Sequence, residues 1–298
     1  MPNNVTNKPL ENERFLTTSL LAALEAGDAI QEIYHTGFEV EYKKDHSPLT
    51  LADKTAHDII VGHLLEFGIP ILSEEGKAIS FQERKAWDTL WIVDPLDGTK
   101  EFVKRNGEFT VNIALVKDGI PILGVVYAPD KDLLYFAMQD LGTYKIANPE
   151  IIRVCQDGLK TEITLKSILK TAQRLPLLNQ KEKPYTIVGS RSHATPDLEQ
   201  FVAEKRETFG EVDFIPAGSS LKICLVAEGR AHIYPRLAPT MEWDTAAGHA
   251  VAQYAGARIY EYESGETLKY NKENLLNPWF IIEGSKDSRV QGSEGNKP

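Results

Sequence analysis

The sequence contains only two cysteines, Cys155 and Cys224, among its 298 residues. They form no Cys-x-x-Cys pair and no Cys/His cluster. A disulfide framework is therefore excluded, and zinc is a weaker candidate for a bound metal ion. No apolar run approaches the ~20 residues that a membrane-spanning helix needs. The first apolar segment, residues 15–33, carries three acidic side chains that a secretory signal would not tolerate. We therefore expect a cytoplasmic protein, with peripheral contact at the inner membrane face left open.

Positive charge is also scarce. The chain has 33 Lys and Arg residues against 43 Asp and Glu residues, which gives a formal net charge of −10. Because such a surface repels a polyanionic backbone, we exclude nucleic acid as a partner. A small phosphorylated substrate can still bind where metal ions reverse the sign of the charge locally. The hydrophobic content of 42% is ordinary for a globular protein with a large core.

The stretch from Thr89 to Phe102 contains the first candidate site. Residues 89–93 are apolar, aromatic and β-branched, which predicts a buried strand that Asp94 and Pro95 should end. Gly98 then permits a tight turn directly after Asp97. Two carboxylates three positions apart on such a corner can hold a divalent cation against a phosphate. Asp-Pro and Asp-Gly are also common turn elements, so the corner by itself leaves a plain loop possible.

Three further acidic residues occur in similar settings. Asp45 lies in a loop before a helix, Glu74 follows a short strand at residues 70–72, and Asp244 stands where a helix N-cap belongs. Mg²⁺ prefers oxygen ligands and is usually shared between a few carboxylates and substrate phosphate. Clustered carboxylates repel one another unless protons or cations neutralise them. The pattern therefore predicts a Mg²⁺ site.

A phosphatase mechanism follows from these residues. Asp94 is expected to bridge two metal ions, with Asp97 and Asp244 completing one site and Glu74 the other. The backbone N–H groups of Gly98 and Thr99 are expected to bind phosphate oxygens. Thr99, hydrogen-bonded toward Asp45, is expected to orient the attacking water.

Periodicity divides the chain into two halves. After a mobile start at residues 1–12, residues 13–150 should form an α+β half with most metal ligands: two amphipathic helices, the second ending near Phe67, and then an antiparallel meander over residues 109–144. Residues 151–183 are weakly patterned and should connect the halves. Residues 184–284 should form an α/β half that carries the last metal ligand. Residues 285–298 read as a flexible tail.

Three motifs together resemble the inositol monophosphatase superfamily of Mg²⁺-dependent, lithium-sensitive phosphatases. They are Ser-Glu-Glu at 73–75, Asp-Pro-Leu-Asp-Gly-Thr at 94–99 and Trp-Asp-Thr-Ala-Ala-Gly at 243–248. The resemblance implies a layered αβαβα sandwich, mostly antiparallel in the larger sheet and mixed in the smaller one. It implies Asp45 and Thr99 as the water-activating pair and, as metal ligands, Glu74, Asp94, the Leu96 carbonyl, Asp97 and Asp244.

Local detail resembles one branch of that superfamily, the bacterial 3′(2′),5′-bisphosphate nucleotidases of the CysQ type. The corner continues as Thr-Lys-Glu-Phe at 99–102, and the segments at 189–193 and 218–222 also fit this branch. This implies a phosphatase with two or three Mg²⁺ ions that converts adenosine 3′,5′-bisphosphate to AMP. The implied substrates also include 3′-phosphoadenosine 5′-phosphosulfate. The implied nucleotide-binding residues are His193, Ser219, Lys222 and Arg236.

Other interpretations stay open at this stage. An inositol monophosphatase or a broader sugar phosphatase would use the same metal site. A haloacid dehalogenase-like enzyme would use Asp94 as a nucleophile, but its paired aspartates are spaced Asp-x-Asp and its sheet is parallel. A non-catalytic phosphometabolite sensor would keep the metal site alone. Lys222 in a first helical turn would ordinarily be a solvated charge, His193 a local hydrogen-bonding residue, and His249 a structural one.

Overall fold

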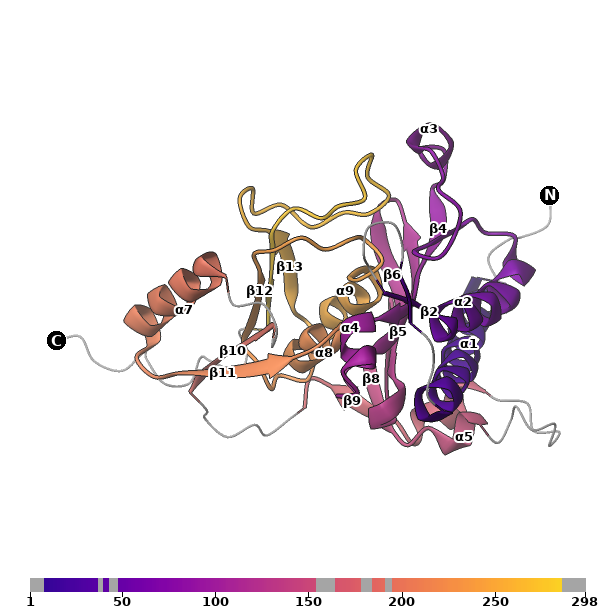
Figure 1. Ribbon diagram of the computed structural model, residues 1–298, viewed down its shortest axis with the longest axis horizontal. Coiled ribbons are helices and arrows are strands. Elements are labelled where there is room, and N and C mark those ends of the chain that lie inside the picture. The colour runs from indigo at the N-terminus through magenta and orange to yellow at the C-terminus, as the bar shows by residue number, and fades with distance from the viewer. Residues whose placement is uncertain are drawn as a thin grey trace.

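Helical and sheet layers alternate across the molecule in the order helix, sheet, helix, sheet, helix (Figure 1). The predicted layered αβαβα sandwich is therefore confirmed. The computed structural model describes residues 8–36, 40–42, 48–153, 164–177, 184–190 and 195–285. Most of the two predicted terminal segments, residues 1–7 and 286–298, lies outside these ranges.

The larger sheet is an antiparallel meander with one parallel edge strand. Val111 to Val126 form its centre, where strands β5 and β6 pair across the Asp118–Gly119 turn. The meander predicted over residues 109–144 is thus confirmed, and β3 pairs with β4 in parallel. In spatial order the described strands are β3 (Ile71–Ser73), β4 (Thr89–Asp97), β5 (Thr110–Lys117), β6 (Ile120–Ala128), β7 (Leu133–Met138), β8 (Gly142–Ala147) and β9 (Gln173–Leu175).

Two long helices cover the outer face of this sheet. They are α1 (Lys8–Thr36) and α2 (Leu51–Leu64), and their apolar stripes pack on the face that carries Trp91 and Val93. The second predicted helix is one turn too long, because its last turn is the 3₁₀ helix η1 (Leu65–Phe67), which ends at Gly68 with a φ of 63°. A two-stranded sheet of β1 (Val40–Tyr42) and β2 (Pro48–Thr50) precedes α2.

The central layer consists of α8 (Leu221–Ala227) and α9 (Ala246–Gln253), which lie between the two sheets. Small residues let α9 approach the larger sheet closely: a Cβ on Gly124 of β6 would collide with the Ala247 carbonyl oxygen. Both helices begin at the same end of the layer, where the preceding loops carry Ser219, Ser220 and Asp244.

The smaller sheet is mixed, as predicted. Strand β10 pairs in parallel with β11 and β12, whereas β14 is antiparallel to both of its neighbours. Helix α7 (Pro196–Phe209) covers its outer face. In spatial order the described strands are β11 (Val212–Ala217), β10 (Tyr185–Ser190), β12 (Ile233–Arg236), β14 (Phe280–Glu283) and β13 (Arg258–Glu261).

Short helices occupy the connections. They are α3 (Phe81–Arg84), α4 (Thr99–Val103), η2 (Pro129–Lys131), α5 (Glu150–Arg153) and α6 (Leu165–Leu169). Within the part of the chain that the structure describes, none of the helices combines the length and the apolar character needed to cross a membrane.

Candidate active site

The acidic corner is carried by β4 itself. The prediction that Asp94 and Pro95 end the strand is wrong, because β4 runs on to Asp97. Its pairing with β5 shifts register between Asp94 and Asp97, and its ladder with β3 stops at Val93, so the N–H that proline lacks falls in a bulge. The bulge leaves Asp94 1% exposed, with its Oδ1 accepting a hydrogen bond of 3.1 Å from the Leu96 N–H.

Glu74 lies beside this corner at the end of the neighbouring strand. Its backbone N–H donates to the Val93 carbonyl at 3.2 Å, so the parallel pairing of β3 with β4 fixes the distance between Glu74 and Asp94. The Glu74 side chain is exposed, in contrast to the buried Asp94.

Asp244 completes the cluster from the other half of the chain. The N-cap predicted for it is wrong: the cap residue of α9 is Thr245, and Asp244 Oδ2 instead accepts a hydrogen bond of 2.9 Å from the Met241 N–H in its own loop. This bond turns the carboxylate toward the larger sheet. One carboxylate oxygen each from Glu74, Asp94 and Asp244 lies within 4.8 Å of the others.

Electrostatic repulsion in this cluster is strong. Burial raises the pKa of Asp94 well above its ordinary value. Nearby carboxylates raise that pKa further, in decreasing order Glu74, Asp97, Asp244 and Asp53. Burial, followed by the charge of Asp97, raises the pKa of Asp244 to about 8. Five acids that repel one another in a partly buried place need a cation or protons to neutralise them.

Asp97 and Gly98 contact the loop before α8, which comes from the second half of the chain. Asp97 Oδ2 lies 3.2 Å from Ser220 Oγ, which is also 2.9 Å from the Asp244 carbonyl oxygen. Ser219 Oγ lies 2.9 Å from the Asp97 carbonyl oxygen. Gly98 has a φ of 89°, and a Cβ there would collide with Ser219 Oγ. Only glycine therefore fits this turn without strain.

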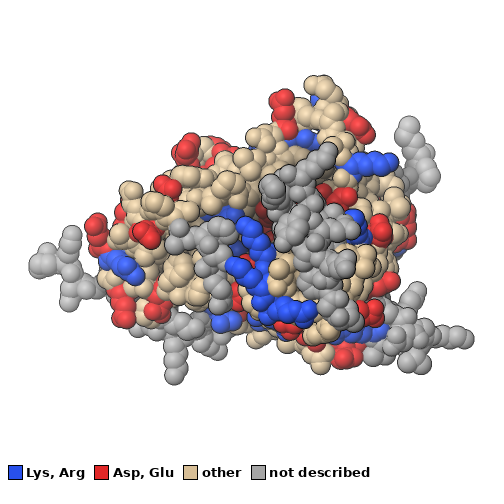
Figure 2. Space-filling model, in the orientation of Figure 1, with Lys and Arg blue, Asp and Glu red and all other residues tan. Residues whose placement is uncertain are grey.

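An open cavity extends from Asp97 and Asp244 toward the smaller sheet. Its lining includes Asp97, Asp244, Ser219, Lys222, Tyr234 and Arg236. The structure thus brings three of the four predicted nucleotide-binding residues to one cavity with two of the predicted metal ligands. On the face drawn in Figure 2, Lys and Arg side chains gather near the middle, over α4 and α8, although the net charge of the chain is −10.

Lys222 is the least ordinary residue of this cavity. A lysine in a first helical turn is usually solvated, but Lys222 is 7% exposed and its Nζ donates to the Ser219 carbonyl at 2.7 Å. Burial lowers the pKa of Lys222 to about 8, against the opposing charge of Asp97, and the charge of Arg236 lowers it further. Arg236 donates to the Pro239 carbonyl at 2.7 Å. Two neighbouring cations thus face the cavity.

The sequence and the fold have clear relatives. The inositol monophosphatase family model matches residues 11–289. The chain belongs to the inositol monophosphatase family. It is 43% identical to the 3′(2′),5′-bisphosphate nucleotidase CysQ of Salmonella typhimurium, over 87% of this chain and 96% of the relative, and 39% identical to the CysQ of Buchnera aphidicola, over 95% and 94%. The crystal structure of CysQ from Bacteroides thetaiotaomicron superposes with a TM-score of 0.81 at 47% identity, covering 95% of this chain and 99% of that one.

The inositol monophosphatase family is metal-dependent, and the residues present fit a metal ion. Asp94 Oδ2 is buried and has no hydrogen-bond partner among the described residues, although a buried carboxylate oxygen normally has one. A cation would satisfy it. The donors are carboxylate oxygens without sulfur or imidazole, which suits a hard divalent ion.

Two of the remaining predicted residues can be located and two cannot. Leu96 is buried within β4, and Thr99 is the first residue of α4, directly after the Gly98 turn. Both therefore belong to the acidic corner. Asp45 and His193 lie outside the described residues.

Asp53 was missed in the sequence analysis. It is 3% exposed in the first turn of α2, and its charge raises the pKa of Asp94. A signal was available, because Asp53, Ala56 and Ile60 share helical spacing and so lie on the buried face of α2. An acid on an apolar helical face is more often functional than one on a solvated face.

Tyr234 was missed as well. It is 4% exposed, lines the cavity from β12, and its ring centroid lies 5.8 Å from Lys222 Nζ. Burial raises its pKa to about 12, with the charge of Arg236 opposing. The apolar strand sequence around Tyr234 gives no signal that its side chain lines the cavity.

Proposed function

We propose that this protein is a metal-dependent phosphatase that removes the 3′-phosphate of adenosine 3′,5′-bisphosphate, giving AMP and phosphate. The observation that carries the proposal is the juxtaposition in one cavity of two predicted metal ligands, Asp97 and Asp244, with two cations, the buried Lys222 and the half-buried Arg236. A substrate with two phosphates needs both parts: one for the phosphate that leaves and one for the phosphate that stays. The names of the relatives, which are 3′(2′),5′-bisphosphate nucleotidases, support the same substrate.

The metal proposed for the acidic cluster is Mg²⁺, with two or three ions held by Glu74, Asp94, the Leu96 carbonyl, Asp97 and Asp244. When bound, such ions lower the pKa of a coordinated water and neutralise phosphate charge. The protein contributes the fixed positions. Asp94 and Asp97 lie at the two ends of the β4 bulge, and Asp244 comes from the loop before α9, which supports this set of ligands.

The corner residues are proposed to hold the leaving phosphate and the water. Gly98 and Thr99 stand at the start of α4, where a phosphate oxygen is proposed to accept from their N–H groups. The Thr99 hydroxyl is proposed to orient the attacking water, with a carboxylate accepting its proton. Asp45 was predicted for that carboxylate, and Asp53 is a second candidate because it is buried beside Asp94.

Separate variants distinguish these two acids. Asp53→Asn should lower kcat by about 10²–10⁴-fold if Asp53 supports the water, the usual contribution of a positioned acid or base. Asp45→Asn should then remain near the wild-type kcat. The reverse pattern would assign the role to Asp45.

The second phosphate is proposed to bind the cationic side of the cavity. Lys222 and Arg236 supply charge-assisted hydrogen bonds, and Ser219 and His193 complete the nucleotide site. A cavity with such a cationic side should also accept 3′-phosphoadenosine 5′-phosphosulfate, whose 5′ group is likewise anionic. An inositol monophosphate has no second phosphate to bind Lys222, which is buried, or Arg236, which is half-buried.

Phosphate release tests the proposal. The purified protein with Mg²⁺ should be assayed on adenosine 3′,5′-bisphosphate, inositol 1-phosphate and fructose 1,6-bisphosphate, each with and without chelator. We expect the highest kcat/KM for the adenosine bisphosphate and no release in chelator. A higher kcat/KM for inositol phosphate would favour the inositol monophosphatase alternative. No release from any of the three would favour a sensor.

A further inference from the structure

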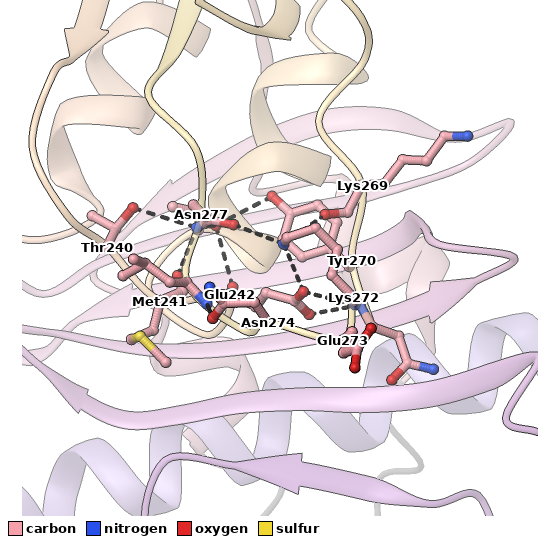
Figure 3. A network of polar contacts seen from close by, with 12 residues as sticks. Thr240, Met241, Glu242, Lys269, Tyr270, Lys272, Glu273, Asn274 and Asn277 are labelled. Atoms are coloured by element: carbon pink, nitrogen blue, oxygen red, sulfur yellow. Dashed lines mark hydrogen bonds and ion pairs between the residues drawn. The ribbon is translucent and has the colours of Figure 1, made fainter. Parts of the chain in front are cut away.

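A polar network outside the cavity anchors the loop that carries Asp244. Figure 3 shows this loop beside the segment from Lys269 to Asn277, and Met241 forms an isolated β-bridge with Leu276. Asn277 is 4% exposed and contacts the loop at several points. Its backbone N–H donates to the Thr240 carbonyl at 2.8 Å, and its Nδ2 lies 2.8 Å from the Met241 carbonyl oxygen and 3.0 Å from Thr245 Oγ1. Asn277 therefore holds the chain on both sides of Asp244.

An ion pair between Lys272 and the buried Glu242 fixes Asn277 in turn. Glu242 is 0% exposed and accepts hydrogen bonds from the Asn271 N–H at 2.6 Å and from Lys272 Nζ at 2.6 Å. Lys272 Nζ also lies 3.2 Å from Asn277 Oδ1. The Lys272 ammonium thus contacts both Glu242 and Asn277 (Figure 3). Buried charges held by several hydrogen bonds have little freedom to move.

The loop needs such an anchor because Asp244 stands where other charges repel it. Its carboxylate lies within 4.8 Å of those of Glu74 and Asp94. Within the described ranges, the direct hydrogen bond to the Asp244 carboxylate comes from the Met241 N–H of the same loop, so it cannot resist a movement of the whole loop. The contacts of Asn277 and Glu242 reach outside the loop and can.

We propose that Asn277 and Lys272 are positioning residues that hold Asp244 in place for metal binding. This inference rests on the proposed metal site but on neither the substrate nor the reaction. Ligand-supporting residues of this kind typically change metal affinity by about 10- to 100-fold when they are removed. Neither Asn277 nor Lys272 lines the cavity, although Asn277 contacts Thr240 and Thr245, which do. Metal affinity is therefore the readout that reports on Asp244.

The chain offers a matched control. Lys145 on β8 pairs with Glu228 at 2.7 Å, much as Lys272 pairs with Glu242 at 2.6 Å, and both glutamates are almost fully buried. Strands β5, β6 and β7 separate β8 from β4 and its acidic corner. Lys272→Met and Lys145→Met therefore each remove one ammonium from a buried glutamate, but only the first is next to Asp244.

The test is Mn²⁺ binding by the purified full chain, followed by the loss of the free-ion electron paramagnetic resonance signal, together with a thermal melt of each variant. Asn277→Leu and Lys272→Met should weaken Mn²⁺ binding by about 10- to 100-fold. Lys145→Met should lower the Tm yet bind Mn²⁺ within about twofold of wild type.

Two results would overturn the inference: wild-type Mn²⁺ affinity in both loop variants, or an equal loss of affinity in Lys145→Met. If Asn277→Leu does not fold, Asn277→Ser keeps part of the polar contact and carries the same test. Because the probe is the metal alone, the Mn²⁺ affinities can still be interpreted if the proposed nucleotidase activity is not found. If wild-type protein binds no Mn²⁺, the metal site itself is refuted.

Discussion

Replacing Lys222 by methionine tests the claim that this cavity distinguishes a bisphosphate from a monophosphate. The substitution keeps the length of the stem and removes the ammonium. Burial lowers the pKa of Lys222 to about 8, so at pH 7 about ten molecules carry the charge for each one that does not. The ammonium is therefore present under ordinary assay conditions.

The size of the effect follows from the kind of bond that is lost. A hydrogen bond to a charged group contributes about 1.5–3 kcal/mol, and each ~1.4 kcal/mol is a factor of ten. Lys222→Met should therefore lower kcat/KM for adenosine 3′,5′-bisphosphate by about 10- to 150-fold. Adenosine 3′-monophosphate lacks the phosphate that the ammonium would bind, so its kcat/KM should change by less than about threefold.

The pH dependence gives an independent check. Because the pKa of Lys222 is lowered, its charge is lost as the pH rises through about 8. The ratio of kcat/KM for the bisphosphate to that for the 3′-monophosphate reports the free enzyme and should fall from pH 8 upward in the wild type. The ratio should be flat in Lys222→Met. Equal losses for both substrates, or a persistent fall of the ratio in the variant, would refute this role.

Three further outcomes are expected. Asp94→Asn should lower kcat by at least about 10²–10³-fold without lowering the Tm in chelator, since it removes a repelled charge rather than packing; substantial turnover would refute the bridging role. Burial and Asp97 raise the pKa of Asp244 from 3.8 to about 8, so metal-free protein should lose stability as the pH rises from about 4 to 8. Its Tm in chelator should be higher at pH 6 than at pH 8, with saturating Mg²⁺ removing the difference, and a Tm that rises with pH would contradict the account. Gly98→Ala should destabilise more than Gly265→Ala, because both have a positive φ but only Gly98 meets Ser219; equal free energies of unfolding in urea would show that the collision relaxes.

Local patterns were enough to predict much of the fold. The apolar periodicity of the segment from Phe15 to Ile33 gave α1, and the Asp118–Gly119 turn between two apolar runs gave the β5–β6 hairpin. In both cases the residues that decide the structure are close together in the sequence. The motif resemblance then supplied the layers, which no local pattern contains.

The errors arose where distant contacts override a local preference. Pro95 is a good reason to end a strand, but the bulge opposite β5 accommodates it. Lys222 looks solvated in its own helix, yet the loop with Ser219 and strand β12 with Tyr234 bury it. Asp244 has the sequence of an N-cap, but its carboxylate bonds the Met241 N–H instead.

The network around Glu242 shows the same limit for the candidate site. Lys272 lies 30 residues from Glu242 in the sequence, so no spacing rule connects them. The segment between them contains helix α9 and strand β13, so the contact depends on how these elements pack. Only the tertiary structure shows that Asn277 holds both sides of a predicted metal ligand.

The identity of the phosphate that leaves tests the central claim most directly. Phosphorus-31 NMR can follow adenosine 3′,5′-bisphosphate during incubation with the purified protein and Mg²⁺, because the 3′ and 5′ phosphates give separate signals. The account predicts that the 3′ signal disappears, the 5′ signal persists as AMP and inorganic phosphate grows in step. Loss of the 5′ signal, or two unchanged signals, would contradict it.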